Sequence, residues 1–199
     1  MFAYIKGSLE QKSNNFVVIE VAGIGYKVFM PSNSIDKLGN IGDKVKVYTY
    51  YYVREDNISL YGFSSNEELR MFELLISVSG IGAKSAIATL SEVSPSSFAL
   101  SVITNDVSKL TKIPGIGKKT AERLILELKD KLKTESTIEK YEETKSVIVE
   151  NEKIDEAISA LQVLGYSRRE VENIIEKIDV EKLELEDIIK QGLKYLAKN

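Results

Sequence analysis

The stretch Thr111-Lys112-Ile113-Pro114-Gly115-Ile116-Gly117-Lys118-Lys119-Thr120-Ala121-Glu122-Arg123-Leu124-Ile125 decides how the centre of this chain folds. Pro114 leads into Gly115-Ile116-Gly117, and Lys118-Lys119-Thr120 then open a strongly helical run. Two glycines one residue apart allow a tight turn and let the backbone approach a ligand without a Cβ in the way. The unpaired N–H groups and the dipole of the following helix make a site for an anion. Because two lysines and a threonine hydroxyl stand at the same place, the predicted anion is phosphate.

The same pattern occurs a second time, in residues 78–90, Val-Ser-Gly-Ile-Gly-Ala-Lys-Ser-Ala-Ile-Ala-Thr-Leu. At an offset of 35 positions the shared residues are Gly80/Gly115, Gly82/Gly117, Lys84/Lys119 and Ser85/Thr120. A single Gly-x-Gly can be a connector between packed helices, but two copies in register indicate a repeated structural unit. Two phosphate sites side by side suit a polymer of phosphates better than a single nucleotide.

Neither copy is a nucleotide-binding fingerprint. A P-loop needs a glycine five positions before its Gly-Lys-Ser/Thr, and Lys112 stands there. A dinucleotide-binding turn needs a third glycine where Ser85 and Thr120 stand. The chain is therefore not expected to hydrolyse ATP or to bind NAD.

Composition excludes several kinds of chemistry. The 199 residues contain neither cysteine nor histidine, so disulfides, thiolate metal sites and the usual general base are all missing. Met1–Lys6 lacks the pattern of a signal peptide, and no run approaches the roughly 20 apolar residues of a membrane helix. We expect a cytoplasmic protein with no metal, no cofactor and no catalytic residue.

The charge distribution points to nucleic acid although the net charge is −3. Residues 80–133 carry 9 basic and 5 acidic side chains, whereas residues 134–199 carry 10 and 16. The basic segment is the one that holds both glycine turns. A local positive face on an acidic protein is the expected electrostatic footprint of a nucleic-acid site.

The N-terminal third has the pattern of β structure. Phe16–Val21 and Tyr26–Met30 are β-branched and aromatic runs around Ala22-Gly23-Ile24-Gly25, which is a hairpin pattern rather than a third helix-opening turn. Residues 44–52 and 58–63 alternate as two further strands joined by a polar turn. About five short strands in some 60 residues fit a small barrel of the OB type.

From Asn66 the apolar spacing becomes helical. Helices are expected from about Asn66, over 84–90, from Ser94-Pro95-Ser96, and from the second glycine turn to about Leu132. Residues 133–150 are rich in charge and hydroxyls and predict a flexible linker. Residues 153–199 then carry three short amphipathic stripes, the first ended by Gly165 as a helix C-cap.

Two short motifs have more than one interpretation. Glu55-Asp56 is a solvated turn, a carboxylate pair that repels phosphates and keeps strands apart, or, least favoured, part of a metal site. Leu164-Gly165-Tyr166 either ends a helix and covers that end with an aromatic ring, or forms the partner-binding turn of a domain similar to ubiquitin-associated domains. The residues alone leave both questions open.

The motifs in their order resemble the bacterial RuvA family, the DNA-binding subunits of the Holliday junction branch-migration complex. The resemblance covers the whole chain and is carried by Tyr52-Val53-Arg54-Glu55-Asp56, Leu60-Tyr61-Gly62-Phe63, Gly80-Ile81-Gly82-Ala83-Lys84, residues 114–124 and Leu164-Gly165-Tyr166. It implies an α+β multidomain protein: an OB-fold β-barrel over 1–64, an all-α helix-hairpin-helix domain over 65–135, a flexible linker over 136–150, and a mobile three-helix domain over 151–199.

The resemblance also assigns roles to residues. The phosphate-binding set is Gly80, Gly82, Lys84, Ser85, Gly115, Gly117, Lys118, Lys119, Thr120 and Arg123. Glu55 and Asp56 match an acidic pin that separates strands, and Leu161, Leu164 and Tyr166 are the candidates for contact with the hexameric ATPase RuvB. The implied partners are Holliday junction DNA, RuvB and a RuvC-type resolvase. The implied assembly is a homotetramer, alone or as two tetramers face to face in an octamer.

Two other classes compete with a non-catalytic adaptor. Helix-hairpin-helix units also occur in DNA glycosylases and nucleases, but a glycosylase needs a catalytic Asp or Lys in a base pocket and a nuclease needs clustered metal-binding acids. The second rival is a single-strand-binding protein that uses the OB barrel. Strand cleavage or base release would favour an enzyme, and a preference for single strands over four-way junctions would favour the second rival.

Overall fold

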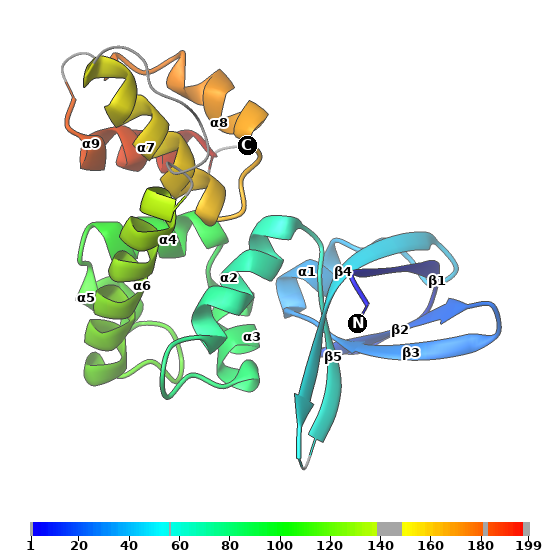
Figure 1. Cartoon of the computed structure of the whole chain (residues 1–199). Coiled ribbons are helices and arrows are strands. Elements are labelled where there is room, and N and C mark those ends of the chain that lie inside the picture. Colours follow the sequence, from blue (N-terminus) through cyan, green and yellow to red (C-terminus); the bar gives the residue numbers. More distant parts are fainter. Residues whose placement is uncertain (1, 56, 139–148, 181–182, 197–199) are drawn as a thin grey trace.

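A computed structural model describes residues 2–55, 57–138, 149–180 and 183–196 of the chain. Figure 1 shows a β-barrel beside a group of central helices, with the C-terminal helices packed on the far end of that group. The barrel strands are β1 (Tyr4–Lys12), β2 (Phe16–Val21), β3 (Ile24–Phe29), β4 (Lys44–Arg54) and β5 (Asn57–Phe63).

The five strands close in the order β1-β2-β3-β5-β4, with β3 and β5 parallel at Phe29 and Tyr61 and the other pairs antiparallel. Alternate positions point inward and fill the barrel; the buried residues of this core include Ile5, Leu9, Val17, Ile19, Val28, Val45 and Val47. Ala22 and Gly23, with φ of 52° and 84°, form the turn between β2 and β3. The predicted hairpin and five-stranded barrel are confirmed.

A short helix that the sequence did not predict, α1 (Ser32–Asp36), joins the barrel to the central helices. The Asn33 Nδ2 donates to the Leu90 carbonyl at 2.9 Å, and the Ser34 hydroxyl donates to Glu68 Oε1 at 2.7 Å. The buried Glu68 carboxylate also accepts the backbone N–H and the hydroxyl of Ser64, both at 2.9 Å. These hydrogen bonds satisfy a buried charge and fix the barrel against the helices.

The central helices are α2 (Asn66–Ile76), α3 (Ala83–Glu92), α4 (Pro95–Ile103), α5 (Val107–Leu110) and α6 (Lys118–Ile138). Ser65 and Ser94 cap α2 and α4, because their side chains accept the backbone N–H groups of Glu68 and Ser97. The last helix runs to Ile138, beyond the predicted end near Leu132. The ends of the predicted linker over 136–150 are therefore helical, and its remaining residues 139–148 lie outside the described ranges.

Among the described residues of the C-terminal part, three helices are present, as expected: α7 (Val149–Val163), α8 (Arg168–Ile175) and α9 (Leu185–Leu196). Gly165 ends α7 with φ of 97°, and its N–H donates to the Gln162 carbonyl at 2.8 Å. Its predicted role as a helix stop is confirmed. Ser167 and Glu170 form a reciprocal capping box at the start of α8.

The C-terminal helices share one hydrophobic core with the central helices. Buried residues of α2, α4 and α6 belong to the same cluster as buried residues of α7, α8 and α9. The Arg70 Nε on α2 also donates to the Val163 carbonyl at the end of α7, at 3.1 Å. The expected mobile domain is thus packed against the centre of the chain in this structure (Figure 1).

Candidate nucleic-acid interface

The two glycine turns have the same backbone geometry. Gly80 and Gly115 have φ of 90° and 85°. In the first turn the Ile81 N–H donates to the Val78 carbonyl at 3.1 Å, and in the second the Ile116 N–H donates to the Ile113 carbonyl at 3.0 Å. One turn is therefore built twice, each time directly before a helix, α3 or α6.

An isoleucine anchors each turn while the glycines face open space. Ile81 and Ile116 are only 8% and 6% exposed, so each holds its loop against the core. A Cβ added to Gly80, Gly82, Gly115 or Gly117 would meet nothing within 4 Å. The positive φ explains glycine at the first position of each pair. At Gly82 and Gly117 neither φ nor packing within the protein demands glycine, which leaves room for a ligand to approach the backbone.

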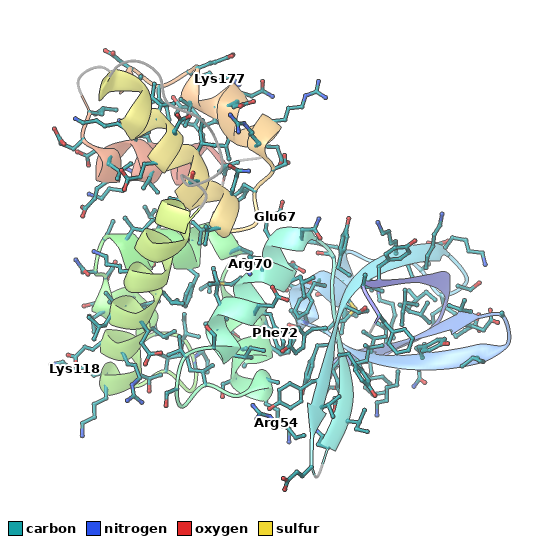
Figure 2. All side chains as sticks on the ribbon, viewed as in Figure 1. Arg54, Glu67, Arg70, Phe72, Lys118 and Lys177 are labelled. Carbon is teal, nitrogen blue, oxygen red and sulfur yellow. The ribbon has the colours of Figure 1, made fainter. Side chains whose placement is uncertain are left out.

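The charges at these helix starts are the reverse of the usual preference. Helices α2, α8 and α9 carry acidic residues in their first turn, whereas α3 and α6 carry none there. Lys84, Lys118 and Lys119 occupy these positions and are exposed. Figure 2 shows Lys118 pointing away from the protein at the start of α6. Positive charge at a positive helix end costs free energy unless an anion binds there.

The hydroxyl residues of the predicted set lie at equivalent places. Ser85 is exposed on α3 and Thr120 is half-buried on α6, each directly after its lysine. The structure therefore brings main-chain N–H groups, a hydroxyl and an ammonium group together at each turn. Donors of these three kinds commonly bind phosphate oxygens in protein–DNA complexes, so the predicted role of the turns stays a prediction that this geometry fits.

Arg123 has internal partners that the sequence did not predict. Its Nη1 donates to the Ser79 carbonyl at 3.3 Å, and its Nε lies 3.4 Å from Glu127 Oε1. The guanidinium group therefore ties α6 to the first glycine turn. The predicted contact of Arg123 with phosphate stays a prediction, and in this structure its guanidinium group also contacts the first turn.

The predicted acidic pin lies on the β4–β5 hairpin, which projects from the barrel (Figure 1). Glu55 is exposed at its tip, whereas Asp56 lies outside the described residues. The base of the hairpin is held by the Tyr52 ring, which meets the Tyr61 ring edge-on at 5.8 Å. Within the described ranges no group of three or more Asp, Glu, His or Cys residues could hold a metal ion.

The predicted partner residues are mostly interior in this arrangement. Leu161 is fully buried against Gly192, and Leu164 lines a small apolar cavity with Met71 and Phe98. Tyr166 is half-buried, and burial raises its pKa to about 12, partly offset by a hydrogen bond with Ser96. The prediction that these three residues contact an ATPase stays a prediction, but here they face the protein's own helices.

Known families match the chain along its length. The family described as RuvA N terminal domain matches residues 1–62, the SAM-like helix-hairpin-helix tandem matches residues 72–130, and the RuvA C-terminal domain matches residues 152–197. A protein of Acetivibrio thermocellus named Holliday junction branch migration complex subunit RuvA is 54% identical over 201 positions, which cover all of both chains. The chain belongs to the RuvA family.

Two further RuvA proteins with the same printed name support this membership. The one from Ruminiclostridium cellulolyticum is 46% identical over 98% of this chain and all of its own. One from Clostridium perfringens is 42% identical over the full length of both chains. RuvA proteins thus match every part of the fold, from the barrel to the C-terminal helices.

Sequence reasoning missed residues that join the RuvA domains to each other. The run Pro31-Ser32-Asn33-Ser34 is a helix-start pattern, and it could have predicted α1. Nothing local to the sequence indicates that Asn33 reaches Leu90 or that Arg70 reaches Val163, 57 and 93 positions away.

In the described part of the chain no single helix is long and apolar enough to cross a membrane. Only α3 and α4 taken together have the length and composition of a span, and they are bent by 99° relative to each other.

Proposed function

We propose that this chain is the non-catalytic DNA-binding subunit of a Holliday junction branch-migration complex. The observation that carries the proposal is the pair of glycine turns with the same geometry, each opening a helix with one or two lysines in its first turn. Main-chain N–H groups and ammonium groups bind the sugar–phosphate backbone without reading sequence. Recognition therefore follows the geometry of the four-way junction, and affinity falls as salt rises.

Assembly of four copies would multiply these contacts. The barrel exposes large apolar side chains, among them Phe2, Tyr4, Tyr51, Val53 and Ile58. Phe2 and Tyr51 meet edge-on with centroids 5.9 Å apart, so the exposed groups are in part contiguous. Exposed apolar surface of this kind supports self-association through the barrel. A tetramer brings eight turns to one junction, which raises the effective concentration of each.

The motor is supplied by a partner. The C-terminal domain is proposed to recruit the RuvB hexamer, whose ATPase moves the DNA, and a RuvC-type resolvase would act on the same junction. Removal of α7 to α9 uncovers the core that they share with the central helices, so circular dichroism must first show that a chain ending at residue 148 is folded. The folded shortened chain should then still bind a four-way junction but fail to stimulate the RuvB ATPase. Stimulation by the shortened chain would contradict the recruiting role.

Junction binding is tested by titrating the full chain against a four-way junction, a duplex and a single strand at one salt concentration. We expect the junction to bind most tightly. In a second titration series, Lys84→Ala with Lys119→Ala should weaken binding and reduce the slope of log affinity against log salt by about 1 to 2.

The matched control is Lys37→Ala with Lys177→Ala, which removes the same charge from exposed lysines outside the two turns. Equal losses in both double variants would show that net charge, and not the turns, drives binding. Incubation of the junction with the protein and Mg²⁺ separates an adaptor from an enzyme, since strand cleavage or base release would overturn the proposal.

A further inference from the structure

A groove of about 900 Å³ runs between the barrel and α3. One wall is formed by the barrel, with Phe29 and Tyr61, and the opposite wall by the exposed side of α3, with Ile87 and Ala88. Figure 1 shows α3 beside β5 and the β4–β5 hairpin, and residues of α3 and β5 line the groove. Apart from Lys84, which belongs to the predicted phosphate-binding set, no lining residue has a functional role assigned above.

The ends of this groove meet the proposed DNA site. Lys84, which lines it, follows the first glycine turn, and Pro114, which also lines it, precedes Gly115 of the second. At the hairpin end the groove is lined by Asn57, two residues after Glu55. A DNA strand that leaves the hairpin tip can therefore follow the groove toward the glycine turns.

The wall of the barrel offers an aromatic surface. The Phe29 ring lines the groove, and the buried Tyr61 ring supports it from below, with centroids 5.9 Å apart. The Phe16 ring lies behind the lining residues, 6.3 Å from Phe29, and the Lys27 ammonium lies over both rings, 4.2 Å from the Phe16 centroid and 5.2 Å from the Phe29 centroid, so a base that stacks on Phe29 would share the ring with this flexible cation. Unpaired bases stack on such rings, whereas the bases inside a duplex have both faces covered.

Polar groups and charge also fit an unpaired strand. The amides of Asn15 and Asn57 and the hydroxyl of Ser59 line the groove and can bond base edges or sugar oxygens. Lys84 places a positive charge at one end, and Glu92 is the one carboxylate among the residues that form the groove. OB barrels commonly bind nucleic acid on this strand face between their loops.

We propose that this groove holds unpaired nucleotides of a DNA strand next to the junction crossover. The inference rests on the proposed junction-binding function and adds a second class of contact to it. The glycine turns hold paired arms by their phosphates, and the groove holds separated bases by stacking on Phe29. The barrel would then stabilise the open crossover through bases, while the hairpin tip acts through charge.

The test uses the full chain and a four-way junction that carries 2-aminopurine either at the crossover or in the middle of an arm. Stacking quenches this fluorescent base, so we expect protein binding to quench the crossover probe and leave the arm probe unchanged. Phe29→Leu keeps an apolar side chain and removes the ring. It should abolish the quenching and lower the affinity for a junction with unpaired crossover bases by about fivefold.

A charge series at Ala88 tests the groove without touching the core, because this side chain is exposed on α3. Ala88→Glu should weaken binding of the unpaired-crossover junction, Ala88→Lys should strengthen it, and Ala88→Gln should act as the steric control between them. Circular dichroism melting confirms that each variant is folded. The same titrations against plain duplex should change much less.

The outcomes separate this inference from the function on which it rests. Tight junction binding with no crossover quenching, or with quenching that Phe29→Leu and Ala88→Glu leave intact, would overturn the groove site and leave the adaptor role standing. No preference for the junction in the wild-type chain would overturn both. If Ala88→Glu changes the native mass of the assembly and not the quenching, the groove is a contact between copies and the proposal is wrong.

Discussion

Gly165 at the end of α7 lies directly against Glu67 on α2, so closely that a Cβ on Gly165 would come within 2.7 Å of the Glu67 Cα. Figure 2 shows Glu67 and Arg70 on the end of α2 that faces the C-terminal helices. The glycine therefore has two separate reasons to be there, its positive φ and the backbone beside it. The C-cap of one domain thus forms part of the contact with another.

Gly165→Ala should loosen the C-terminal domain from the central helices. The left-handed conformation of the alanine costs about 1–2 kcal/mol, and its Cβ also clashes with the backbone of α2. Hydrogen exchange at α2, α4 and α7 should rise. Gly23→Ala is the control, because its φ of 84° gives similar strain with nothing within 4 Å. Equal exchange at α2 in both variants would show that the contact does not depend on Gly165.

Gly82→Ala with Gly117→Ala should separate folding from binding. Neither Cβ meets another atom of the protein within 4 Å, and neither glycine has positive φ, so each change should cost less than about 1 kcal/mol of stability. The methyl groups would occupy the space where phosphates approach. Loss of two hydrogen bonds predicts about a tenfold lower junction affinity by fluorescence anisotropy. Unchanged affinity in the folded double variant would exclude these turns as the contact.

Ser34→Ala should destabilise the link between the barrel and the helices. It removes the hydrogen bond to Oε1 of the buried Glu68 carboxylate, at a cost of about 2 kcal/mol in urea unfolding. Ser8→Ala is the matched control, since the Ser8 hydroxyl accepts a hydrogen bond from the exposed Lys44 ammonium, and it should lower the free energy of unfolding by no more than about 0.5 kcal/mol. A cost for Ser34→Ala no larger than that of Ser8→Ala would mean that α1 does not secure the two domains.

Tyr166 should make stability fall at high pH. Burial raises its pKa from 10.0 to about 12, so the folded state keeps the phenol proton more strongly than the unfolded chain. Its contribution is full below pH 10 and is lost as the pH rises from about 10 to 12. Tyr166→Phe removes this dependence, so wild type should lose up to about 2 kcal/mol relative to the variant over that interval. If the difference in unfolding free energy between wild type and Tyr166→Phe were the same at both ends of this pH interval, the raised pKa of Tyr166 would be contradicted.

Glu55→Gln with Asp56→Asn should leave junction binding equal or tighter, because two negative charges near phosphates are removed. The same change should alter strand exchange driven by RuvB and ATP. A gel-based branch-migration assay measures this against the wild-type chain. Weaker junction binding in the double variant would contradict a repulsive role for the hairpin tip.

Much of the fold could be read from local patterns. The hairpin at Ala22-Gly23, the caps at Ser65 and Ser94 and the stop at Gly165 are each specified by one or two residues whose backbone preferences leave few alternatives. The twin turns were found for the same reason, because glycine, lysine and hydroxyl recur at a fixed spacing. Helix ends were predicted less well: α6 continues beyond its apolar pattern and ends at Ile138.

By itself, the sequence determined the order of the domains, the paired glycine turns and membership of the RuvA family, since these depend on residue type and short spacing. Only the tertiary structure decided that Arg123 on α6 donates to the Ser79 carbonyl, that Leu164 faces Met71 and Phe98, and that Phe29 and Lys84 line one groove. These relations join residues far apart in the chain. They are fixed by the packing of whole elements, and no local pattern of side chains encodes which surfaces will meet.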